Sequence, residues 1–342
     1  MNAVQMTDVG GPLQRRVLPL PTLGETDVLV RIRAAGICHT DEHYRAGTGS
    51  VAFLPITLGH EVAGVVDKAG PLARSVAVGD RVVVHYLVTC GRCRYCLSGH
   101  EQFCPSGQMI GKHRHGGYAD YILVPASSVV ALPDPIPFEH GAIMMCSTAT
   151  SFHALRKGRL QPGDRVAIFG AGGLGISAVQ LSFLMGALAV YAVDIRADKL
   201  ALAGRHGATP VDGSRSDPVD AIKELTGGDG VDVALELVGL PVTMRQCVRS
   251  LGRMGRAVMV GLSDRAFEVH TYQDLLGNEA EVIGCSDHLR SELPVLLEFA
   301  RQGRLDFSHV VSRTVPLDAE AINDVLASLR RFESHVRTVI VP

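Results

Sequence analysis

Residues 165–186 read RVAIFGAGGLGISAVQLSFLMG, and they begin with a short apolar run typical of a buried strand. The apolar segment from Gly175 onward favours a helix, and a glycine-rich turn, Gly170–Gly175, joins the two. A GxGxxG turn that follows a strand and opens a helix is typical of a unit that binds a dinucleotide. The segment therefore predicts a doubly wound parallel sheet with a nucleotide site at this turn.

Each glycine of the predicted loop has its own physical reason. Gly170 makes the tight turn, Gly172 lets the backbone approach a pyrophosphate, and Gly175 allows the helix to pack closely on the strand. The N-terminus of the helix then offers free N–H groups and a positive dipole end to the phosphates. The loop residues expected to contact the cofactor are Gly170, Gly172, Gly173, Leu174 and Gly175.

Asp194 ends the next predicted strand, about twenty residues after the turn. A carboxylate at this place would accept a hydrogen bond from the ribose 2′-hydroxyl and repel a 2′-phosphate, which favours NAD over NADP. Arg196 follows closely and could weaken that discrimination. The competing interpretation is a glycine turn beside a surface aspartate, but the strand–turn–helix context favours NAD binding.

Strand and helix patterns alternate around this segment, over residues 149–285, which predicts an α/β domain with a parallel sheet. The region before it differs, because short β-like runs such as DVLVRIRAAG (27–36) are separated by glycine, proline and charged residues. This pattern of short strands separated by turns predicts a barrel-like β domain. The chain ends in helical patterns and a strand, RTVIVP (337–342), and we expect this tail to return to the first domain.

The bulk composition excludes several classes of function. The 342 residues suffice for two domains, and a net charge of −2 without a basic block gives no footprint for nucleic acid. No apolar run approaches the ~18–20 residues that span a membrane. The first residues lack the features of a secretory signal, so we expect a cytoplasmic protein with reduced thiols. Its eight cysteines are therefore expected to be metal ligands, catalytic thiolates or core residues.

Four of these cysteines crowd into TCGRCRYCLSGHEQFC, residues 89–104. Cys90, Cys93, Cys96 and Cys104 would surround a tetrahedral Zn²⁺ with four sulfurs and leave no position for a substrate. An iron–sulfur cluster and a pair of disulfides are the alternatives. The spacing favours a structural zinc, so any metal chemistry must lie elsewhere in the chain.

A second metal site can be assembled from cysteines that lie near histidines. Cys38 opens CHTDEH, His60 lies in GHE, and Cys146 ends AIMMC. Each alone is more simply a buried cysteine or a hydrogen-bonded histidine. Together they form a Cys₂His set that leaves the fourth position of a catalytic zinc open. Cys247 and Cys285 are interpreted as packing residues.

With these motifs the sequence resembles the zinc-containing medium-chain alcohol dehydrogenases, nearly from end to end. GHEVAGVVDKAGPLA (59–73) matches the zinc signature of that family, CHTDEH and CSTAT carry two further ligands, and Cys90–Cys104 matches its structural-zinc lobe. The resemblance implies a GroES-like β-barrel catalytic domain over residues 1–148 with a lobe at 88–105, a Rossmann domain over 149–285, and a return to the catalytic domain over 286–342.

The resemblance also implies roles around the catalytic zinc. Cys38, His60 and Cys146 would hold it, with Glu61 as a nearby or transient ligand. Asp41 would orient the histidine ligand, as metal-bound imidazoles usually require. Thr40 would take the alcohol proton and pass it through the cofactor ribose towards His43. For His43 the plain alternative is a surface histidine, and for Glu61 it is a simple ion pair.

The remaining cofactor contacts follow from the resemblance as well. His39 and Arg337 resemble contacts to the pyrophosphate, and Lys199 resembles a contact to the adenosine ribose. Neighbours of the nicotinamide would be Thr150 and the turn Val260, Gly261 and Leu262. An exposed Arg or Lys at such places is otherwise simply solvated.

The resemblance implies an NAD-dependent enzyme that oxidises a primary or secondary alcohol and reduces the matching aldehyde or ketone. A catalytic and a structural zinc would be held by each chain, and a homo-oligomer, preferably a tetramer, is expected. Relatives often place a tryptophan in the substrate wall; this chain has none, and counting from GDRVVVHYL places Tyr86 at that position. A polyol or amino-alcohol dehydrogenase and a non-catalytic dinucleotide-binding redox sensor are the alternatives.

Overall fold

The computed structural model describes residues 1–331 and 336–342, which divide into two compact units. The first unit comprises Met1–Cys146 and Leu289–Pro342, and the second comprises Ser147–His288. Each unit has an apolar core of its own.

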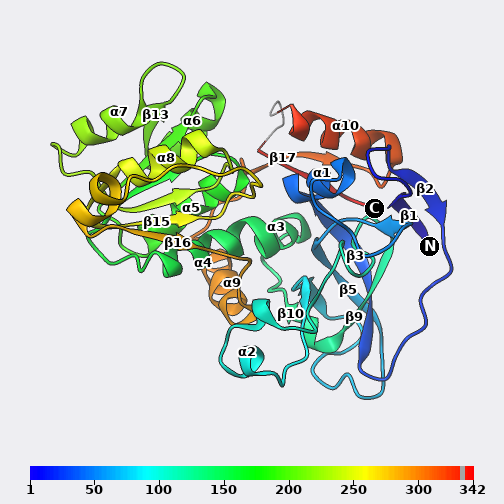
Figure 1. Cartoon of the computed structure of the whole chain (residues 1–342). Helices are drawn as coiled ribbons and strands as arrows, with labels where there is room; N and C mark the ends of the chain where they lie inside the picture. Colours follow the sequence, from blue (N-terminus) through cyan, green and yellow to red (C-terminus); the bar gives the residue numbers. More distant parts are fainter. Residues whose placement is uncertain (332–335) are drawn as a thin grey trace. The chain divides into compact units, whose positions relative to one another are not determined.

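The second unit is built on a six-stranded parallel sheet with the order β13-β12-β11-β14-β15-β16. Helices alternate with the strands along the chain and lie against the sheet (Figure 1). The central strands are buried on both faces, as their Val- and Ala-rich sequences require. The strands are β11 (Arg165–Phe169), β12 (Ala189–Asp194), β13 (Thr209–Asp212), β14 (Val231–Glu236), β15 (Leu251–Met259) and β16 (Glu281–Gly284). The helices are α4 (Ala149–Lys157), α5 (Gly173–Leu184), α6 (Ala197–Arg205), α7 (Pro218–Leu225), α8 (Pro241–Arg249), the π-helix η4 (Thr271–Leu275) and the 3₁₀ turn η5 (Leu276–Asn278).

This architecture confirms the predicted doubly wound sheet. The chain leaves β11 in one direction towards β12 and β13, and returns to its other side with β14. The glycine-rich turn therefore follows the strand at which the winding reverses, which is where open α/β sheets bind their ligands.

The first unit contains a seven-stranded sheet with the order β10-β6-β5-β3-β18-β17, in which β9 also pairs with β3. Its pairs are antiparallel except β17 with β18. The strands of this sheet are β3 (Asp27–Ile37), β5 (Glu61–Ala69), β6 (Arg81–Val84), β9 (Tyr121–Pro125), β10 (Val129–Ala131), β17 (Val311–Val315) and β18 (Arg337–Ile340). Smaller sheets are formed by β1 (Asn2–Met6), β2 (Gln14–Val17) and β4 (Ile56–Thr57), and by β7 (Leu87–Val88) and β8 (Gln108–Met109).

Short helices fill the ends of this unit. They are α1 (His39–Ala46), α2 (Arg94–Leu97), α3 (Phe138–Ile143), α9 (Leu293–Arg301), α10 (Ala319–Arg330) and the 3₁₀ turns η1 (Glu101–Phe103), η2 (Ala126–Ser128) and η6 (Arg290–Glu292). A π-helix, η3 (Met144–Thr148), joins α3 to α4. The β-rich first unit agrees with the β domain predicted for this part of the chain.

The long strand β3 organises the part of this unit that carries the candidate ligands. Its neighbour β5 pairs Glu61 with Gly36, so His60 lies beside the end of β3, where Cys38 begins α1. The C-terminal strand β18 pairs with the same end of β3 through Thr338 and Ile37. Residues 36–38, residues 60 and 61, and the C-terminal residues 337 and 338 thus lie close together at one end of β3.

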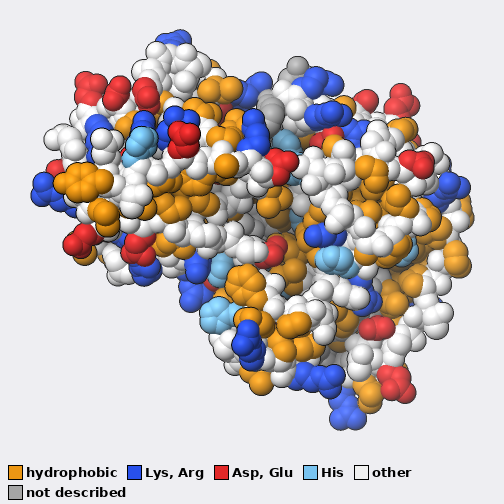
Figure 2. Space-filling model, in the orientation of Figure 1, with side chains coloured by type: hydrophobic (Ala, Val, Ile, Leu, Met, Phe, Trp, Pro, Cys, Tyr) orange, Lys and Arg blue, Asp and Glu red, His pale blue; other side chains and the backbone are white. Residues whose placement is uncertain are grey.

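The surface matches the balanced composition. Lys and Arg side chains are interspersed with Asp and Glu on the face drawn in Figure 2. Within residues 1–331 and 336–342, no helix combines the length and the apolar character needed to cross a membrane.

Candidate active site and metal centres

Four potential metal ligands converge in the interior of the first unit. Cys38, His60, Glu61 and Cys146 each offer a ligand atom, and these atoms lie within 4.8 Å of one another. All four residues are buried. Cys38 is the N-cap of α1, His60 directly precedes β5, Glu61 begins β5, and Cys146 lies in the π-helix η3. A π-turn is a frequent device for aiming a functional side chain.

The polar atoms of this cluster fit a metal ion. The sulfur atoms of Cys38 and Cys146 are 4.0 Å apart. Within the part of the chain that the structure describes, the two ring nitrogens of His60 and the Oε1 atom of Glu61 are buried and form no hydrogen bond. Buried polar atoms without partners are costly, so a ligand is expected there. Two sulfurs and an imidazole nitrogen suit zinc and leave its fourth position free.

The environment of the cluster shifts the pKa values of Cys38 and His60 in opposite directions. The hydrogen bond with Cys146 and the neighbouring His60 lower the pKa of Cys38 well below its usual range, against the effect of burial. Burial alone would lower the pKa of His60, but the charge of Asp41 and the thiolate of Cys38 raise it well above its usual range. The shift of Cys38 favours the thiolate that binds a metal, whereas the shift of His60 favours the protonated ring, which must lose its proton to become a ligand.

Glu61 faces a partner from the far end of the sequence. Its Oε2 pairs with the guanidinium of Arg337 on β18, and both side chains are buried. Burial raises the pKa of Glu61 to about 7, although Arg337 opposes that shift. Burial by itself would lower the pKa of Arg337, but the Glu61 carboxylate and the two thiols hold it above its usual range. The site thus contains a fixed positive charge beside its potential ligands.

The predicted relay residues lie on α1, directly after Cys38. The Thr40 hydroxyl is 3.6 Å from the sulfur of Cys38. His43 lies three residues further along the helix, hence on the same face, and its ring centroid is 4.8 Å from that of His39. Both Thr40 and His43 are half-buried. Tyr86, the predicted pocket residue, packs edge-on against the His60 ring at 5.2 Å.

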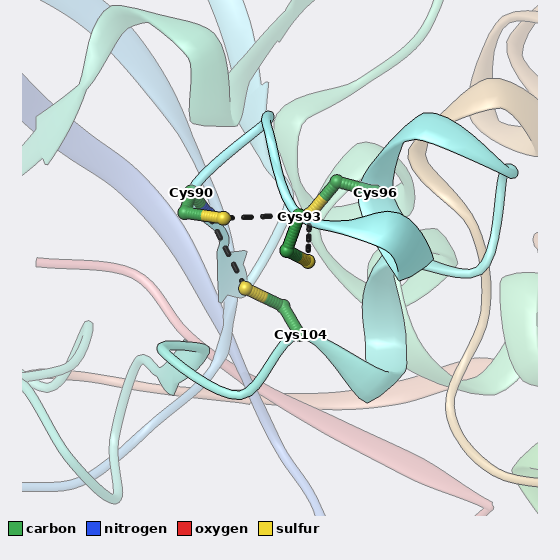
Figure 3. A group of neighbouring side chains, drawn as sticks. All are labelled: Cys90, Cys93, Cys96 and Cys104. Carbon is green, nitrogen blue, oxygen red and sulfur yellow. Dashed lines mark hydrogen bonds between the residues drawn. The ribbon is translucent and has the colours of Figure 1, made fainter.

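The four cysteines of residues 89–104 form a second, separate cluster. The side chains of Cys90, Cys93, Cys96 and Cys104 point toward one another (Figure 3). The Cys93 and Cys96 sulfurs are 3.5 Å apart, and those of Cys90 and Cys96 are 4.0 Å apart. All eight cysteines are free thiols, and they all lie within the described residues. These distances fit four ligands around one ion.

The thiols of this cluster do not titrate alike. Backbone N–H groups of Arg92 and Cys93 lower the pKa of Cys90 to about 6. Burial and the neighbouring Cys93 thiol raise the pKa of Cys96 to about 11. At neutral pH the metal-free loop therefore holds a thiolate at Cys90 and a proton at Cys96.

The glycine-rich turn lies between β11 and α5 of the second unit. A Cβ atom on Gly175 would lie 2.0 Å from the carbonyl oxygen of Gly170, so the close approach of helix and strand requires glycine. A Cβ on Gly172 would meet open space. Asp194, at the end of β12, accepts hydrogen bonds from the backbone N–H of Ala171 at 2.8 Å and of Arg196 at 3.0 Å. The carboxylate is thereby fixed to the turn.

The other predicted cofactor residues are distributed over both units. In the second unit, Thr150 is buried in α4, Lys199 is half-buried in α6, and Val260 opens the turn after β15. Gly173, Leu174 and Gly175 form the start of α5, and Gly261 and Leu262 continue the turn after Val260. In the first unit, His39 begins α1 and Arg337 begins β18. Cys247, interpreted as a packing residue, is buried in α8, whereas Cys285 is half-buried after β16.

Sequence reasoning missed two contacts of the first cluster. The Tyr118 hydroxyl donates to the Asp41 carboxylate at 2.8 Å, and Arg337 pairs with Glu61 across the sheet. A lone tyrosine in a glycine-rich segment carries no chemical pattern. The Arg337 pair depends on the register of β18 with β3, which the local sequence does not reveal.

Comparisons with known proteins agree with this geometry. The family model for the alcohol dehydrogenase GroES-like domain matches residues 24–134, and that for the zinc-binding dehydrogenase matches residues 173–302. An alcohol dehydrogenase of Geobacillus stearothermophilus is 36% identical, covering 99% of each chain. A sorbitol dehydrogenase of Bacillus subtilis is 32% identical over 95% of this chain and 92% of its own. A putative zinc-binding dehydrogenase of Sinorhizobium meliloti, solved with NADP, has a TM-score of 0.91 and 31% identity, covering 100% of this chain and 99% of its own.

Proposed function

We propose, from the premise that this chain belongs to the zinc-containing medium-chain alcohol dehydrogenase family, that it oxidises a primary or secondary alcohol with NAD and reduces the matching carbonyl in reverse. The chain is thus a zinc alcohol oxidoreductase, and the identity of its substrate and of its preferred nicotinamide cofactor are the proposed parts. The convergence of Cys38, His60 and Cys146 in one buried cluster carries the proposal.

The cluster residues would divide the work between them. Cys38, His60 and Cys146 would hold the metal, and Glu61 would stay beside it, balanced by Arg337. Zinc, when bound, would polarise the substrate oxygen, and the nicotinamide would accept the hydride.

Proton removal is assigned to α1. The Thr40 hydroxyl would accept the alcohol proton at Oγ1 and give up its own proton towards the cofactor ribose, and the His43 ring would deliver a proton to solvent. The position of both residues on one helix face, next to Cys38, supports this order. His43 is suited to the last step because an imidazole ring can both accept and donate a proton.

The cofactor is proposed to be NAD. Asp194 is held at the glycine-rich turn by the N–H of Ala171, where its charge would oppose a 2′-phosphate. Arg196, the residue that could favour NADP, is engaged by Asp198 through two hydrogen bonds of 3.1 Å. His39, Lys199, Thr150 and Arg337 remain proposed contacts, together with the Gly170–Gly175 loop and the Val260–Leu262 turn.

Two zinc ions per chain are proposed, because the two clusters are separate and chemically different. The four sulfurs of Cys90, Cys93, Cys96 and Cys104 would close the coordination shell of a structural ion. The Cys₂His cluster would leave a position open for chemistry.

A second candidate substrate class is favoured by one of the relatives. The sorbitol dehydrogenase among them indicates that a polyol is chemically within reach of this scaffold. Tyr86, packed on His60, would narrow the pocket and leave a polar edge. We therefore propose a simple alcohol first and a polyol or amino alcohol second.

The test combines a metal count with turnover. Zinc per chain would be measured, and NADH formation followed with ethanol, a longer primary alcohol, a secondary alcohol, sorbitol and threonine. We expect two zinc ions and turnover of a simple alcohol. Turnover restricted to sorbitol or threonine would favour the second candidate, and two zinc ions without any turnover would favour a redox sensor.

The variant Cys146→Ala removes one proposed ligand of the Cys38–His60–Cys146 cluster and leaves the four-cysteine cluster intact. It should retain about one zinc and the fold, and lose at least ~100-fold in activity, because removing a ligand costs more than removing a partner of a ligand. A variant that keeps most of its turnover would contradict the assignment of the catalytic cluster.

A further inference from the structure

The carboxylate of Asp41 is the most heavily bonded acidic group beside the Cys38–His60–Cys146 cluster. Its Oδ2 accepts from the backbone N–H of Cys38 at 3.0 Å and from the Tyr118 hydroxyl at 2.8 Å. Its Oδ1 accepts from the N–H of Gly59 at 3.2 Å and lies 3.4 Å from Nδ1 of His60. Asp41 is fully buried. A buried carboxylate needs several donors, so each contact affects its orientation.

Two of these donors belong to the segments that carry the potential ligands. Cys38 is a ligand candidate itself, and Gly59 directly precedes His60. The Tyr118 hydroxyl comes from elsewhere in the sequence, and it is the side-chain group that fixes Oδ2 from outside those segments. It thereby determines which way the carboxylate plane faces, and hence how Oδ1 meets His60.

Tyr118 is held rigidly enough for this purpose. Its side chain is fully buried, its N–H donates to Leu58 at 3.0 Å, and its carbonyl accepts from Val4 at 2.8 Å. Gly59 has a φ of +91°, and a Cβ on it would lie 2.5 Å from the Tyr118 ring. The ring therefore packs directly on the backbone next to His60.

The segment before Tyr118 fixes the same turn. Gly116 donates to the carbonyl of Thr57 and Gly117 to that of Gly59, both at 2.7 Å. The backbone N–H groups of residues 116–118 thus each donate a hydrogen bond to a carbonyl of residues 57–59. The hydroxyl of Tyr118 connects this hydrogen-bonded backbone to the carboxylate of Asp41, which lies beside His60.

We propose that the Tyr118 hydroxyl is a positioning group that fixes Asp41, and through it the His60 ring, for metal binding. The inference rests on the proposed zinc site. A ligand imidazole binds more firmly when its other nitrogen faces a fixed acceptor. Because Nδ1 of His60 faces Asp41, Nε2 is the nitrogen left for the metal. Without the hydroxyl, Oδ2 keeps the Cys38 N–H alone and Oδ1 the Gly59 N–H, so the carboxylate is held less firmly against His60.

The test compares zinc-loaded, full-length Tyr118→Phe with the wild type. This substitution removes one oxygen and leaves the ring on Gly59. Tyr121→Phe is the matched control, since it makes the same change three residues further on, in β9, where Tyr121 pairs with Arg31. Thermal melting of each variant checks that it is folded.

The readout is the rate at which zinc passes to an excess of a chromogenic chelator. The kinetic phase that Cys146→Ala lacks is assigned to the Cys38–His60–Cys146 site. We expect Tyr118→Phe to accelerate that phase on the order of ten-fold. The phase of the four-cysteine site should not change, and Tyr121→Phe should behave as the wild type.

An Asp41→Asn background separates positioning from general stability. If the hydroxyl acts through Asp41, Tyr118→Phe will add little to the faster release of Asp41→Asn, because coupled residues are not additive. The same acceleration factor in both backgrounds would overturn the inference, and so would equal release by Tyr118→Phe and the wild type. A wild-type chain that holds zinc only in the four-cysteine site would overturn the proposed function as well, so the two failures differ.

Discussion

His60 and Glu61 are neighbours in sequence, yet their side chains serve different partners. His60 is directed towards Asp41, at 3.4 Å, and Glu61 pairs with Arg337. His60 directly precedes β5 and Glu61 begins it, and the ligand atoms of both lie within 4.8 Å of those of Cys38 and Cys146. Each residue nevertheless has a buried partner of its own, and the charge of Arg337 opposes the rise that burial causes in the pKa of Glu61.

The negative charge of Asp194 can be removed by a mutation that leaves the size of the side chain nearly unchanged. Asp194→Asn keeps an oxygen that can accept from the Ala171 N–H but removes the negative charge. We expect the ratio of kcat/KM with NADP to that with NAD to rise about ten-fold or more, since like charges at a binding site cost several kcal/mol. Steady-state kinetics with both cofactors measures this ratio.

Asp198→Asn is the companion variant, because it removes the negative charge that engages the guanidinium of Arg196 while leaving Asp194 intact. It should raise the use of NADP by a smaller factor. An unchanged cofactor ratio in Asp194→Asn would show that this carboxylate does not select the cofactor.

At the scale of elements, the loop of residues 89–107 depends on its cysteines more than on apolar packing. The short pair β7–β8 closes its base, and its larger apolar side chains, Leu97 and Phe103, are 75% and 52% exposed. A segment with so little buried apolar surface needs another source of order. A metal bound by four thiolates supplies it, since binding free energy at a structural site is folding free energy.

Cys93→Ser tests this dependence. We expect the variant to retain about one zinc per chain and to melt about 5 °C lower or more, because losing a few kcal/mol shifts the melting temperature of a chain this size by several degrees. Calorimetry and a metal assay measure the two effects. A melting temperature equal to that of the wild type would show that the loop is ordered without its ion.

Proton release gives the same loop a defined pH dependence. Zinc binds thiolates, so each thiol with a pKa above the working pH must give up a proton. Cys96, with a pKa raised to about 11, must lose a proton on zinc binding throughout the neutral range. Cys90, with a pKa lowered to about 6, must lose one only at acidic pH. Affinity therefore falls as the pH falls, and falls more steeply below about pH 6, where Cys90 also becomes protonated.

The measurement is chelator competition across pH 5–8 in the Cys146→Ala variant, which isolates the four-cysteine site. The plot of log affinity against pH should steepen by about one order of magnitude per pH unit below pH 6. A slope that stays constant through pH 6 would contradict the low pKa of Cys90.

The elements were predictable to different extents. The sheet around β11 and α5 was confirmed because its apolar runs and glycine turn are local signals. The π-helix that carries Cys146 was not predicted, since an extra residue in a helical turn follows from tertiary packing. The contacts of Tyr118 and Arg337 depend on long-range register, which a single sequence does not encode locally.

At the scale of the whole molecule, the two ends of the parallel sheet differ in how open they are to pairing. β13 forms one edge and contains Pro210 and Asp212, which discourage a further strand. β16 forms the other edge with exposed residues, including Val282 at 39%. In the stretch of chain that precedes this strand, Leu262, Tyr272 and Leu276 are exposed apolar side chains of the second unit. An exposed edge beside apolar surface favours pairing with a second copy of the chain.

We therefore predict a homo-oligomer, with a tetramer as the preferred state, in which β16 is one of the contacts between copies. Light scattering after gel filtration should give four times the chain mass of 36.5 kDa. Val282→Lys places a charge on the β16 edge and should lower the mass, because an edge lysine blocks strand pairing. Thr209→Lys, on the exposed start of β13, is the control and should leave the mass unchanged. A monomeric wild type would contradict the oligomer, whereas an unchanged mass in Val282→Lys would contradict only the role of β16, since the copies would then associate through another surface.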